Sequence, residues 1–441
     1  MVTGLSFQKD YDAYLAKWES LRPEIDAGIE RNRKANLDIH VCDIKGRPIP
    51  GAKITLHQKS HAFDFGCNAL MLGSLDDATE RAYEDGITRL FNLITTTLCW
   101  STTEYEEGKF RFHEGVKELF RRPPVERVIR FAKDNGLRIK GQPLMADSWI
   151  PAWASKNAET LKRQQAAYFQ RAAEYLQGQV DIIDVHNEAF CAVSRTPHYP
   201  LLDQECTFVD WAFETVRGLF PPNVDLELNE ATPVNDTDDW IERYYALAER
   251  LLKKRLPIYS LGLQFHMFNQ DAVMRHIRGE QLNPNKILGT YRRYGQLGLP
   301  LYISEVTVPS NFEGSRAQGE AVQAEILKNL YRLWFSIPQM KGIIYWNLKD
   351  GPAWKTEGDC RGCLLDQRGR EKLSYQTLYQ LIRREWMTEE NLETDAEGFV
   401  RVRGFKGGYT LIVEGPGRSC KTFLELRENK QSLTLKMEGE D

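Results

Sequence analysis

The sequence predicts an α/β fold, namely a (β/α)8 barrel with a small accessory β-sandwich built from strands near the two ends of the chain. Two patterns support this prediction. Through the middle of the chain, short apolar runs alternate with longer stretches whose apolar residues recur every three or four positions. Towards both ends, apolar and polar residues alternate singly around glycine and proline turns, which is typical of antiparallel strands.

The barrel strands are predicted from eight apolar runs of strand length. The runs lie at residues 63–71, 93–99, 138–145, 181–188, 224–231, 260–266, 301–308 and 342–348. Helix-like stretches such as "AETLKRQQAAYFQRAAEYLQG" separate them, and eight strands that each precede a helix indicate a (β/α)8 barrel. A doubly wound open sheet would alternate in the same way. No G-x-G-x-x-G or G-x-x-x-x-G-K-[ST] motif follows any run, however, and this favours the barrel.

The two ends of the chain differ from the middle in their pattern of polar and apolar residues. Residues 1–36 are expected to form a helical segment because they are mostly polar and helix-favouring. Residues 37–60 are expected to form two or three antiparallel strands. Strand groups this small are marginally stable alone. We therefore expect residues 37–61 and 389–441 to pair into one β-sandwich, with the barrel of residues 62–388 inserted between its halves.

The composition limits the partners that the protein is expected to have. The chain has 441 residues, of which 27% are charged, and a formal net charge of only −4. No basic run suggests binding to nucleic acid or to a membrane surface. The first twenty residues lack the apolar core of a signal peptide, and no later segment is long and apolar enough to span a bilayer. We therefore expect a soluble, cytoplasmic protein, or a secreted one if a leader has been removed; its oligomeric state is left open.

Eight cysteines are spread thinly along the chain. Only Cys360 and Cys363 have the close spacing of a metal or redox pair. A zinc site would need a second such pair or nearby histidines, and the sequence offers neither. We expect reduced loop thiols, with no metal site and no cofactor.

Two of the predicted strands end on glutamates. The run "DIIDVHNE" ends on Asn187 and Glu188, and "LYISEVTV" reaches Glu305 near its end. The carboxyl ends of barrel strands open onto the active site, and these are the fourth and seventh strands. One glutamate alone at a strand end is more often a solvated loop residue or half of a surface ion pair. Two carboxylates across one barrel mouth suit glycoside hydrolysis, where one protonates the leaving oxygen and the other attacks or activates water.

Over roughly residues 62–382, the sequence resembles the family 10 glycoside hydrolases, a β-1,4-xylanase family with a (β/α)8 barrel. The family's Trp-Asp-Val-Val-Asn-Glu-Ala is paralleled by "IDVHNEA", its Ile-Thr-Glu-Leu-Asp by "ISEVT", and its Gly-Leu-Gln-x-His is intact as "GLQFH". Its late aromatic positions match "YWNLKDGPAW", and "WSTTEYEEGKF" parallels the segment after its second strand. Each motif is weak alone, but their order along the chain makes the resemblance specific.

The resemblance implies a retaining mechanism with two displacements. Glu305 would attack the anomeric carbon, while Glu188 would protonate the departing oxygen and later deprotonate the attacking water. Retention requires the two carboxyl groups to lie about 5–5.5 Å apart. His266 would hydrogen-bond Glu305, and Asn187 and Gln264 would hold the substrate and the nucleophile near the reacting centre.

The aromatic motif adds expectations for sugar stacking. Trp346 and Trp354 follow the eighth predicted strand, where the resemblance implies platforms for sugar faces. Buried packing is the simpler role for any single tryptophan. Their position after the last strand favours substrate contact.

Two segments depart from the family pattern. Where the family has Gly-His-Thr-Leu-Val-Trp-His, this chain reads "GQPLMAD", so Gln142 and Asp147 replace sugar-binding histidines and Ala146 replaces a stacking tryptophan. Trp149 follows where the family has a polar residue, whereas Trp153 matches a family position. Upstream, "TTLCW" shortens a family segment whose Glu, Asn and Lys grip sugars on the non-reducing side. The chain is therefore expected to be a divergent member with altered glycone subsites.

These losses lead to a hypothesis on substrate. Hydrogen bonds that involve charged groups contribute about 1.5–3 kcal/mol each. Without several of them, the protein should process long unsubstituted xylan poorly. We expect a short xylan-derived oligosaccharide, a decorated chain, or a different β-linked sugar that stacks on Trp149, contacted also by Gln142 and Asp147.

Other functions stay open. One is a non-catalytic carbohydrate-binding protein on a hydrolase scaffold, which predicts damage at the reacting carboxylates. Another is a β-glycosidase for a different sugar with the same carboxylate pair. The sequence leaves endo versus exo action open. The accessory β-module has no aromatic ladder in its sequence, which favours a structural role.

Overall fold

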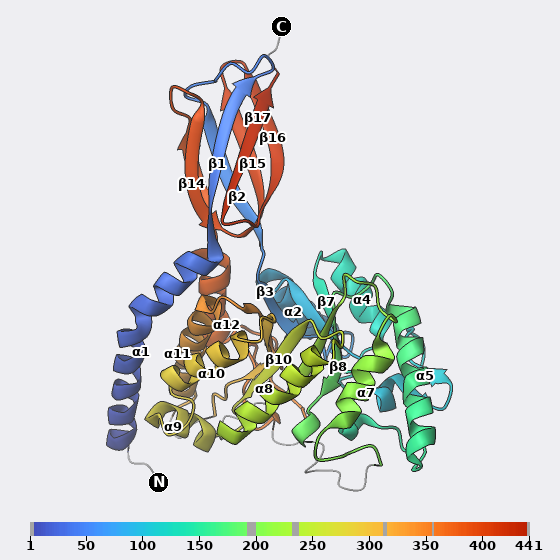
Figure 1. The fold of residues 1–441 in the computed structure, drawn as a ribbon. Helices are drawn as coiled ribbons and strands as arrows, with labels where there is room; N and C mark the ends of the chain where they lie inside the picture. Colours follow the sequence, from blue (N-terminus) through green and yellow to red (C-terminus); the bar gives the residue numbers. More distant parts are fainter. Residues whose placement is uncertain (1–3, 192–199, 232–237, 312–314, 355–356, 439–441) are drawn as a thin grey trace. The chain divides into compact units, whose positions relative to one another are not determined.

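The computed structural model describes residues 4–191, 200–231, 238–311, 315–354 and 357–438 (Figure 1). The chain divides into two compact units. The first comprises Met1–Ser20, Phe65–Asn329 and Gln339–Gln376, and the second comprises Leu21–Asp64, Leu330–Pro338 and Thr377–Asp441. Helices α1 (Gly4–Arg33) and α11 (Arg316–Ser336) each contribute to both units. The domain boundaries expected from the sequence stay a prediction.

The first unit is built on a closed barrel of eight strands. In order around the barrel these are β3 (Asp64–Asn68), β4 (Leu93–Thr97), β7 (Arg138–Gln142), β8 (Ile182–Asn187), β9 (Asp225–Glu230), β10 (Ser260–His266), β11 (Leu301–Thr307) and β12 (Met340–Tyr345). Each strand overlaps one predicted apolar run, and the spatial order follows the sequence. The predicted (β/α)8 barrel is confirmed, with β8 as its fourth strand and β11 as its seventh.

Helices lie between and around the barrel strands (Figure 1). Besides α1 and α11, the helices are α2 (Asp77–Leu90), α3 (Trp100–Thr103), α4 (Val125–Asp134), α5 (Ala158–Leu176), α7 (Thr207–Val216), α8 (Asp238–Lys253), α9 (Gln270–Arg278), α10 (Pro284–Gly295) and α12 (Leu373–Gln380). Short elements complete the two units: strands β5 (Glu104–Glu106) and β6 (Lys109–Phe110), the 3₁₀ turn η1 (Asp147–Trp149) and the π-helical turn η3 (Leu381–Glu385). Among the described residues, no helix carries an apolar stretch long enough to cross a bilayer.

Several helices of the barrel begin at a side chain that caps them. Asp76, Asn157, Asn269 and Asn283 each accept a hydrogen bond from the backbone N–H three residues further on. Such caps satisfy one of the amide donors that the first helical turn leaves unpaired. Pro284 follows the last of these caps at the first helical position, where its missing N–H costs nothing. Local sequence therefore fixes where these helices start.

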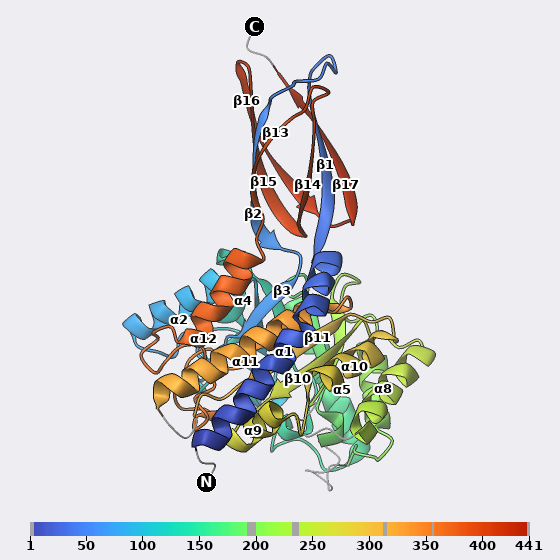
Figure 2. The same ribbon diagram turned by 90° about the vertical axis from the view of Figure 1, so that its left-hand side faces the viewer.

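The second unit contains a β-sandwich of two sheets (Figure 2). One sheet has the order β14-β1-β17 and the other β13-β2-β15-β16. The strands are β1 (Lys34–Asp43), β2 (Lys53–His61), β13 (Glu389–Glu393), β14 (Phe399–Phe405), β15 (Gly407–Gly415), β16 (Arg418–Leu426) and β17 (Lys430–Met437). Each sheet combines one N-terminal strand with C-terminal strands, as the sequence predicted for an accessory sandwich.

The pairing of the two N-terminal strands differs from the prediction. We expected antiparallel strands within residues 37–60, but β1 and β2 lie in opposite sheets, and β1 pairs in parallel with β17. The alternation along β1 buries Leu37 and Ile39 in the core that Ile54 and Leu56 of β2 enter from the other sheet. Facing strands bury more apolar surface than a two-stranded hairpin could, and this explains the arrangement.

The sandwich shows no row of exposed aromatic side chains among the residues that the structure describes. Its exposed rings are Phe399 on β14 and Phe423 on β16, which belong to different sheets. A flat sugar-binding platform on one sheet would need neighbouring rings on the same face. The structural role predicted for this module stays a prediction.

One histidine lies inside the wall of the barrel. His186 of β8 is 1% exposed, and its ring centroid lies 5.1 Å from that of Phe208 on α7. Burial lowers the pKa of His186 to about 3. The imidazole is therefore neutral in the folded protein over the usual pH range.

This burial predicts a loss of stability in mild acid. The unfolded chain protonates His186 near pH 6.5, and the folded protein only near pH 3, so the unfolded state binds more protons between these values. The free energy of unfolding should fall as the pH drops below about 6.5. In His186→Leu this contribution is absent. Between about pH 7 and pH 5, the free energy of unfolding should fall by about 2 kcal/mol more in the wild type than in the variant. Urea unfolding at several pH values measures this difference.

A surface residue that does not titrate provides the control. Phe423 is 74% exposed, so Phe423→Leu should follow the pH dependence of the wild type. Equal pH dependence in His186→Leu and wild type would contradict the neutral, buried histidine.

Candidate active site

The carboxyl ends of the barrel strands surround a cavity of about 620 Å³. All ten residues that the sequence analysis selected for catalysis or substrate binding line it: Gln142, Asp147, Trp149, Asn187, Glu188, Gln264, His266, Glu305, Trp346 and Trp354. They come from strands far apart in the sequence and from the segments that follow them. The barrel thus brings the predicted residues together, while their individual roles stay predictions.

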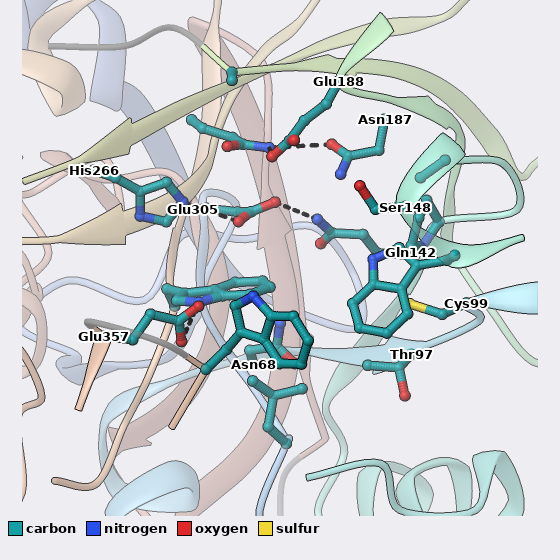
Figure 3. A pocket seen from close by; sticks show the side chains of 18 of the residues that line it. Asn68, Thr97, Cys99, Gln142, Ser148, Asn187, Glu188, His266, Glu305 and Glu357 are labelled. Atoms are coloured by element: carbon teal, nitrogen blue, oxygen red, sulfur yellow. Dashed lines mark hydrogen bonds and ion pairs between the residues drawn. The ribbon is translucent and has the colours of Figure 1, made fainter. Parts of the chain in front are cut away.

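Glu305 lies on β11 and is held from several sides. Its side chain is 4% exposed, and its Oε1 atom accepts hydrogen bonds from Nε2 of Gln142 and, at 3.4 Å, from Nδ2 of Asn229. Its Oε2 atom lies 3.0 Å from Nε2 of His266 (Figure 3). Both carboxylate oxygens therefore have partners that fix the plane of the group.

His266 is itself oriented by its neighbours. Its Nδ1 atom lies 3.0 Å from the hydroxyl of Thr307, and its ring stacks on Phe268 and meets the edge of Trp346. A Thr307 hydroxyl that donates to Nδ1 selects the tautomer whose Nε2–H points at Glu305. His266 therefore contacts Glu305 in a fixed orientation, and its supporting role stays a prediction.

Glu188 is the first residue after β8, and its backbone is unusual. Its φ is +58°, a left-handed conformation that non-glycine residues rarely adopt. Its N–H donates to the carbonyl of Asn229 at 3.1 Å, and its Oε1 accepts from Nε2 of Gln264 at 3.2 Å. Figure 3 shows Glu188 and Glu305 extending into the same cavity. Strained backbone of this kind persists where the surroundings over-determine it, often at functional sites.

Asn229 of β9 connects the groups around both glutamates, and the sequence analysis did not select it. Its Nδ2 atom lies 2.9 Å from Oδ1 of Asn187, 3.1 Å from Oδ2 of Asp184 and 3.4 Å from Oε1 of Glu305. Its Oδ1 atom accepts a hydrogen bond from the hydroxyl of Ser304 at 2.6 Å. The amide is completely buried, so its hydrogen bonds do not compete with water.

A signal for Asn229 was present in the sequence. Both β8 and β9 run into the same three residues, Asn-Glu-Ala, at 187–189 and 229–231. The second glutamate, Glu230, is fully buried and accepts hydrogen bonds from the N–H groups of Phe190 and Ala231. It does not line the cavity. The repeat therefore marks one carboxylate that lines the cavity and one that is buried away from it, and only the fold distinguishes the two.

The bonds around Asn187 also define what its amide can reach. Its Oδ1 accepts from Asn229 and, at 3.1 Å, from Nε2 of Gln264. The planar amide then turns Nδ2 the other way, into the cavity (Figure 3). This leaves a donor facing the space between the two glutamates.

Charged groups lie beneath the site in the barrel interior. Lys140 and Glu227 form an ion pair in which both side chains are fully buried. Burial disfavours the charge on Lys140, but the carboxyl groups of Glu227, Asp184 and Glu305 together outweigh it and raise the pKa of the amine. Burial raises the pKa of Asp184 well above its usual range, in spite of Lys140 nearby. Burial likewise raises the pKa of Glu227, so the interior favours the neutral forms of both carboxyl groups, against the attraction of Lys140.

The walls of the cavity carry the tryptophans. The ring centroids of Trp149 and Trp354 lie 6.2 Å apart with a tilt of 52°, and Trp354 is 59% exposed. Trp346 donates from its indole nitrogen to Glu357 at 3.2 Å. Trp153, by contrast, packs against the buried Trp100, outside the residues that line the cavity. Three of the four tryptophans named from the sequence are thus placed where a sugar ring could contact them.

The cysteine pair shows the features of buried thiols. Cys360 and Cys363 are both free and buried, and burial raises the pKa of Cys360 to about 11. In the described part of the chain, no three histidine, cysteine or acidic side chains gather as a metal site. The geometry gives these thiols no part in the cavity.

Comparison with known proteins places this geometry in a family. The sequence model of glycosyl hydrolase family 10 matches residues 57–381. The chain belongs to glycosyl hydrolase family 10. The crystal structure of native xylanase 10B from Thermotoga maritima superposes with a TM-score of 0.60 at 22% identity, covering 74% of this chain and 96% of that one. At this identity the likeness shows the shared fold.

Two curated relatives differ in what their names describe. The family 10 chain is 25% identical over 416 residues to the anti-sigma-I factor RsgI6 of Acetivibrio thermocellus, covering 92% of this chain and 48% of that protein. It is 22% identical over 324 residues to endo-1,4-beta-xylanase B of Thermotoga neapolitana, covering 70% of this chain and 85% of the xylanase. The chain thus spans about half the length of the first relative and most of the second.

The close packing around Asn229 predicts the effect of a single methyl group. A Cβ atom at Gly262 would lie 2.5 Å from Oδ1 of Asn229 and 2.6 Å from Oε1 of Glu227. We expect Gly262→Ala to turn the Asn229 amide away from Glu305 and to cost about 1–3 kcal/mol of stability, since overpacking a dense interior is destabilising. A crystal structure of the variant and its urea unfolding would measure both effects.

Gly289 provides a matched control in the same barrel. An added Cβ there meets nothing within 4 Å, and the residue lies inside helix α10. Gly289→Ala should keep or raise the stability, by up to about 1 kcal/mol. An unchanged Asn229 and an unchanged stability in Gly262→Ala would refute the steric argument.

Proposed function

We propose that this family 10 protein is a retaining β-glycoside hydrolase that acts on xylan-derived or related β-linked oligosaccharides. Glu188 is the acid/base and Glu305 is the nucleophile. The observation that carries the proposal is the shared network: Gln264 joins Glu188 to Asn187, and Asn229 joins Asn187 to Glu305. Two carboxylates in one cavity, each held by buried amides, suit double displacement.

In the first step, a carboxylate oxygen of Glu305 attacks the anomeric carbon of the bound sugar. The bond from that carbon to the leaving-group oxygen breaks, and Glu188 transfers its proton to this oxygen. Gln142, Asn229 and His266 hold the attacking carboxylate in line. The Nδ2 donor of Asn187 faces the reacting region, where it can hold the sugar hydroxyl next to the anomeric carbon.

In the second step, water replaces the departed group. Glu188, now ionised, removes a proton from the water, whose oxygen attacks the anomeric carbon and displaces the carboxylate of Glu305. The left-handed backbone at Glu188 and the bond from Gln264 keep its carboxyl group at the same place for both proton transfers. The product keeps the β configuration because two inversions occur.

The walls of the cavity support a substrate other than long plain xylan. Several relatives are named endo-1,4-beta-xylanases, and this supports a xylan-related substrate. Near the nucleophile, however, the family's histidine position holds Gln142, which binds Glu305. Thr97 at the end of β4 and Cys99 just before α3 lie on the cavity wall. These short or neutral groups offer fewer strong donors to a polymer.

Removing either glutamate tests the catalytic assignment. We expect Glu305→Ala to abolish aryl β-glycoside hydrolysis, because no nucleophile remains. Glu188→Ala should lower kcat by about 10²–10⁴-fold on a substrate with a poor leaving group. The loss should be smaller on an activated aryl glycoside, because its phenolate leaving group departs without protonation. Release of the chromophore in stopped assays gives both rates.

The wild-type protein supplies the contrast for this test. Its first-formed product, observed by proton NMR, should be the β-anomer, and an α-anomer would contradict retention. Wild type without activity on any glycoside would instead favour a non-catalytic carbohydrate-binding protein. One relative, similar over 92% of this chain, is named an anti-sigma-I factor and not a hydrolase.

The altered walls predict a preference for short substrates. Each lost charge-assisted hydrogen bond is worth about 1.5–3 kcal/mol, so kcat/KM on soluble polymeric xylan should be at least about tenfold below that on short oligosaccharides. Reducing-end release from xylan, xylo-oligosaccharides and aryl glycosides, compared side by side, measures this. Robust cleavage of long, undecorated xylan would defeat the prediction.

A further inference from the structure

We propose that Arg122 makes this cavity selective for β-linked oligosaccharides that carry a carboxylate, that is, a uronic acid unit. The inference deepens the proposed hydrolase function and rests on it for the reaction, but not for binding. Arg122 lines the same cavity as both glutamates. Its guanidinium carbon lies 4.7 Å from the ring centroid of Trp149. A planar cation beside an aromatic face offers a sugar carboxylate two parallel donors and a surface for the ring.

The segment that carries Arg122 is held rigidly. The buried Arg111 donates to the carbonyls of Thr102, Lys117 and Arg122. Arg122 in turn donates from Nη1 to the carbonyl of Arg121 at 2.7 Å, and two prolines follow it. A guanidinium fixed before the ligand arrives loses little conformational entropy on binding.

The charge on Arg122 is not neutralised by the protein as far as the structure describes it. Its neighbour Arg121 pairs with Glu357 at 3.1 Å and bonds Asn347, so that charge is already satisfied. No described carboxylate forms an ion pair with Arg122, and its buried Nε atom has no oxygen acceptor among the described residues. The adjacent thiol of Cys99 cannot compensate, because burial raises its pKa to about 11 and keeps it neutral.

An unpaired guanidinium in a cavity wall is costly unless a ligand supplies the missing charge. The described carboxylates that line the cavity are Asp147, Glu188, Glu305 and Glu357. Glu188 and Glu305 are bound to Gln264, Gln142 and His266, and Glu357 pairs with Arg121. In the described part of the chain none of the four, Asp147 included, forms an ion pair with Arg122, which leaves its charge for the substrate. Thr97, Cys99 and Gln142 line the cavity on one side in Figure 3. The charge of the nearby Arg122 lowers the pKa of the Cys99 thiol, against the larger effect of burial. These observations place the anionic part of the substrate beside Cys99 and Trp149.

Binding to an inactive protein tests the inference without hydrolysis. The probes are a xylo-oligosaccharide bearing a glucuronosyl unit and the same oligosaccharide without it, titrated calorimetrically into Glu305→Ala. We expect the acidic ligand to bind at least about tenfold more tightly, since a hydrogen-bonded charge contributes on that scale. Adding Arg122→Gln should remove most of this difference. Added salt should weaken the binding of the acidic ligand more than that of the neutral one.

Turnover gives a second readout on the active protein. The ratio of kcat/KM for aryl β-glucuronide to that for aryl β-glucoside should fall about tenfold or more in Arg122→Gln. Arg171→Gln is the control, because Arg171 is a surface residue, 63% exposed and paired with Glu174. It should leave the ratio at the wild-type value. If Arg122 had only a structural role, Arg122→Gln would lower kcat/KM equally for both substrates and leave their ratio unchanged.

The outcomes separate the two proposals. Equal binding of the acidic and neutral oligosaccharides, or a ratio that Arg122→Gln leaves unchanged, overturns the role of Arg122 while hydrolysis stands. Preferential acidic binding without turnover of any glycoside overturns the hydrolase and leaves the anionic subsite standing. If both assays show a preference for the acidic compound and Arg122→Gln removes it, the hydrolase and the anionic subsite are both supported.

Discussion

The side-chain amide of Asn229 is the contact on which the rest of the candidate site depends. Two hydrogens on one nitrogen face three oxygens, from Asp184, Asn187 and Glu305, while its own oxygen is held by Ser304. The group is completely buried, so a shift of this amide would leave several polar atoms unpaired at once. This cost ties the orientation of Glu305 to that of Asn187, and through Gln264 to that of Glu188.

The barrel interior beneath this amide is more polar than simple packing would require. A buried ion pair such as that of Lys140 and Glu227 is weak support for stability, because desolvation offsets most of the attraction. Its effect is geometric. It fills the layer below Asp184 with groups that accept few alternative positions. Gly262 belongs to the same layer, since a Cβ atom there would enter the space of Asn229 and Glu227.

The floor of the cavity, at the ends of the barrel strands, and its walls are formed by different kinds of chain segment. The floor is made by side chains on neighbouring strands, whose register the barrel closure fixes. The walls come from segments that follow the strands, such as the loop of Arg121 and Arg122 and the turn that carries Trp149. Loops can change without disturbing the strand pairing. In the proposed function, such walls let one chemistry serve a different sugar.

The sequence by itself determined the eight strands and the sandwich and pointed to the two strand-end glutamates, because period, strand-end position and motif order are all local signals. It did not reveal that β1 and β2 face each other from opposite sheets, that Glu230 is buried while Glu188 lines the cavity, or that Gln142 binds Glu305. Nor did it select Asn229 or Arg122. These features depend on which side chains meet across the barrel, and contacts between distant segments are decided only when the tertiary structure closes.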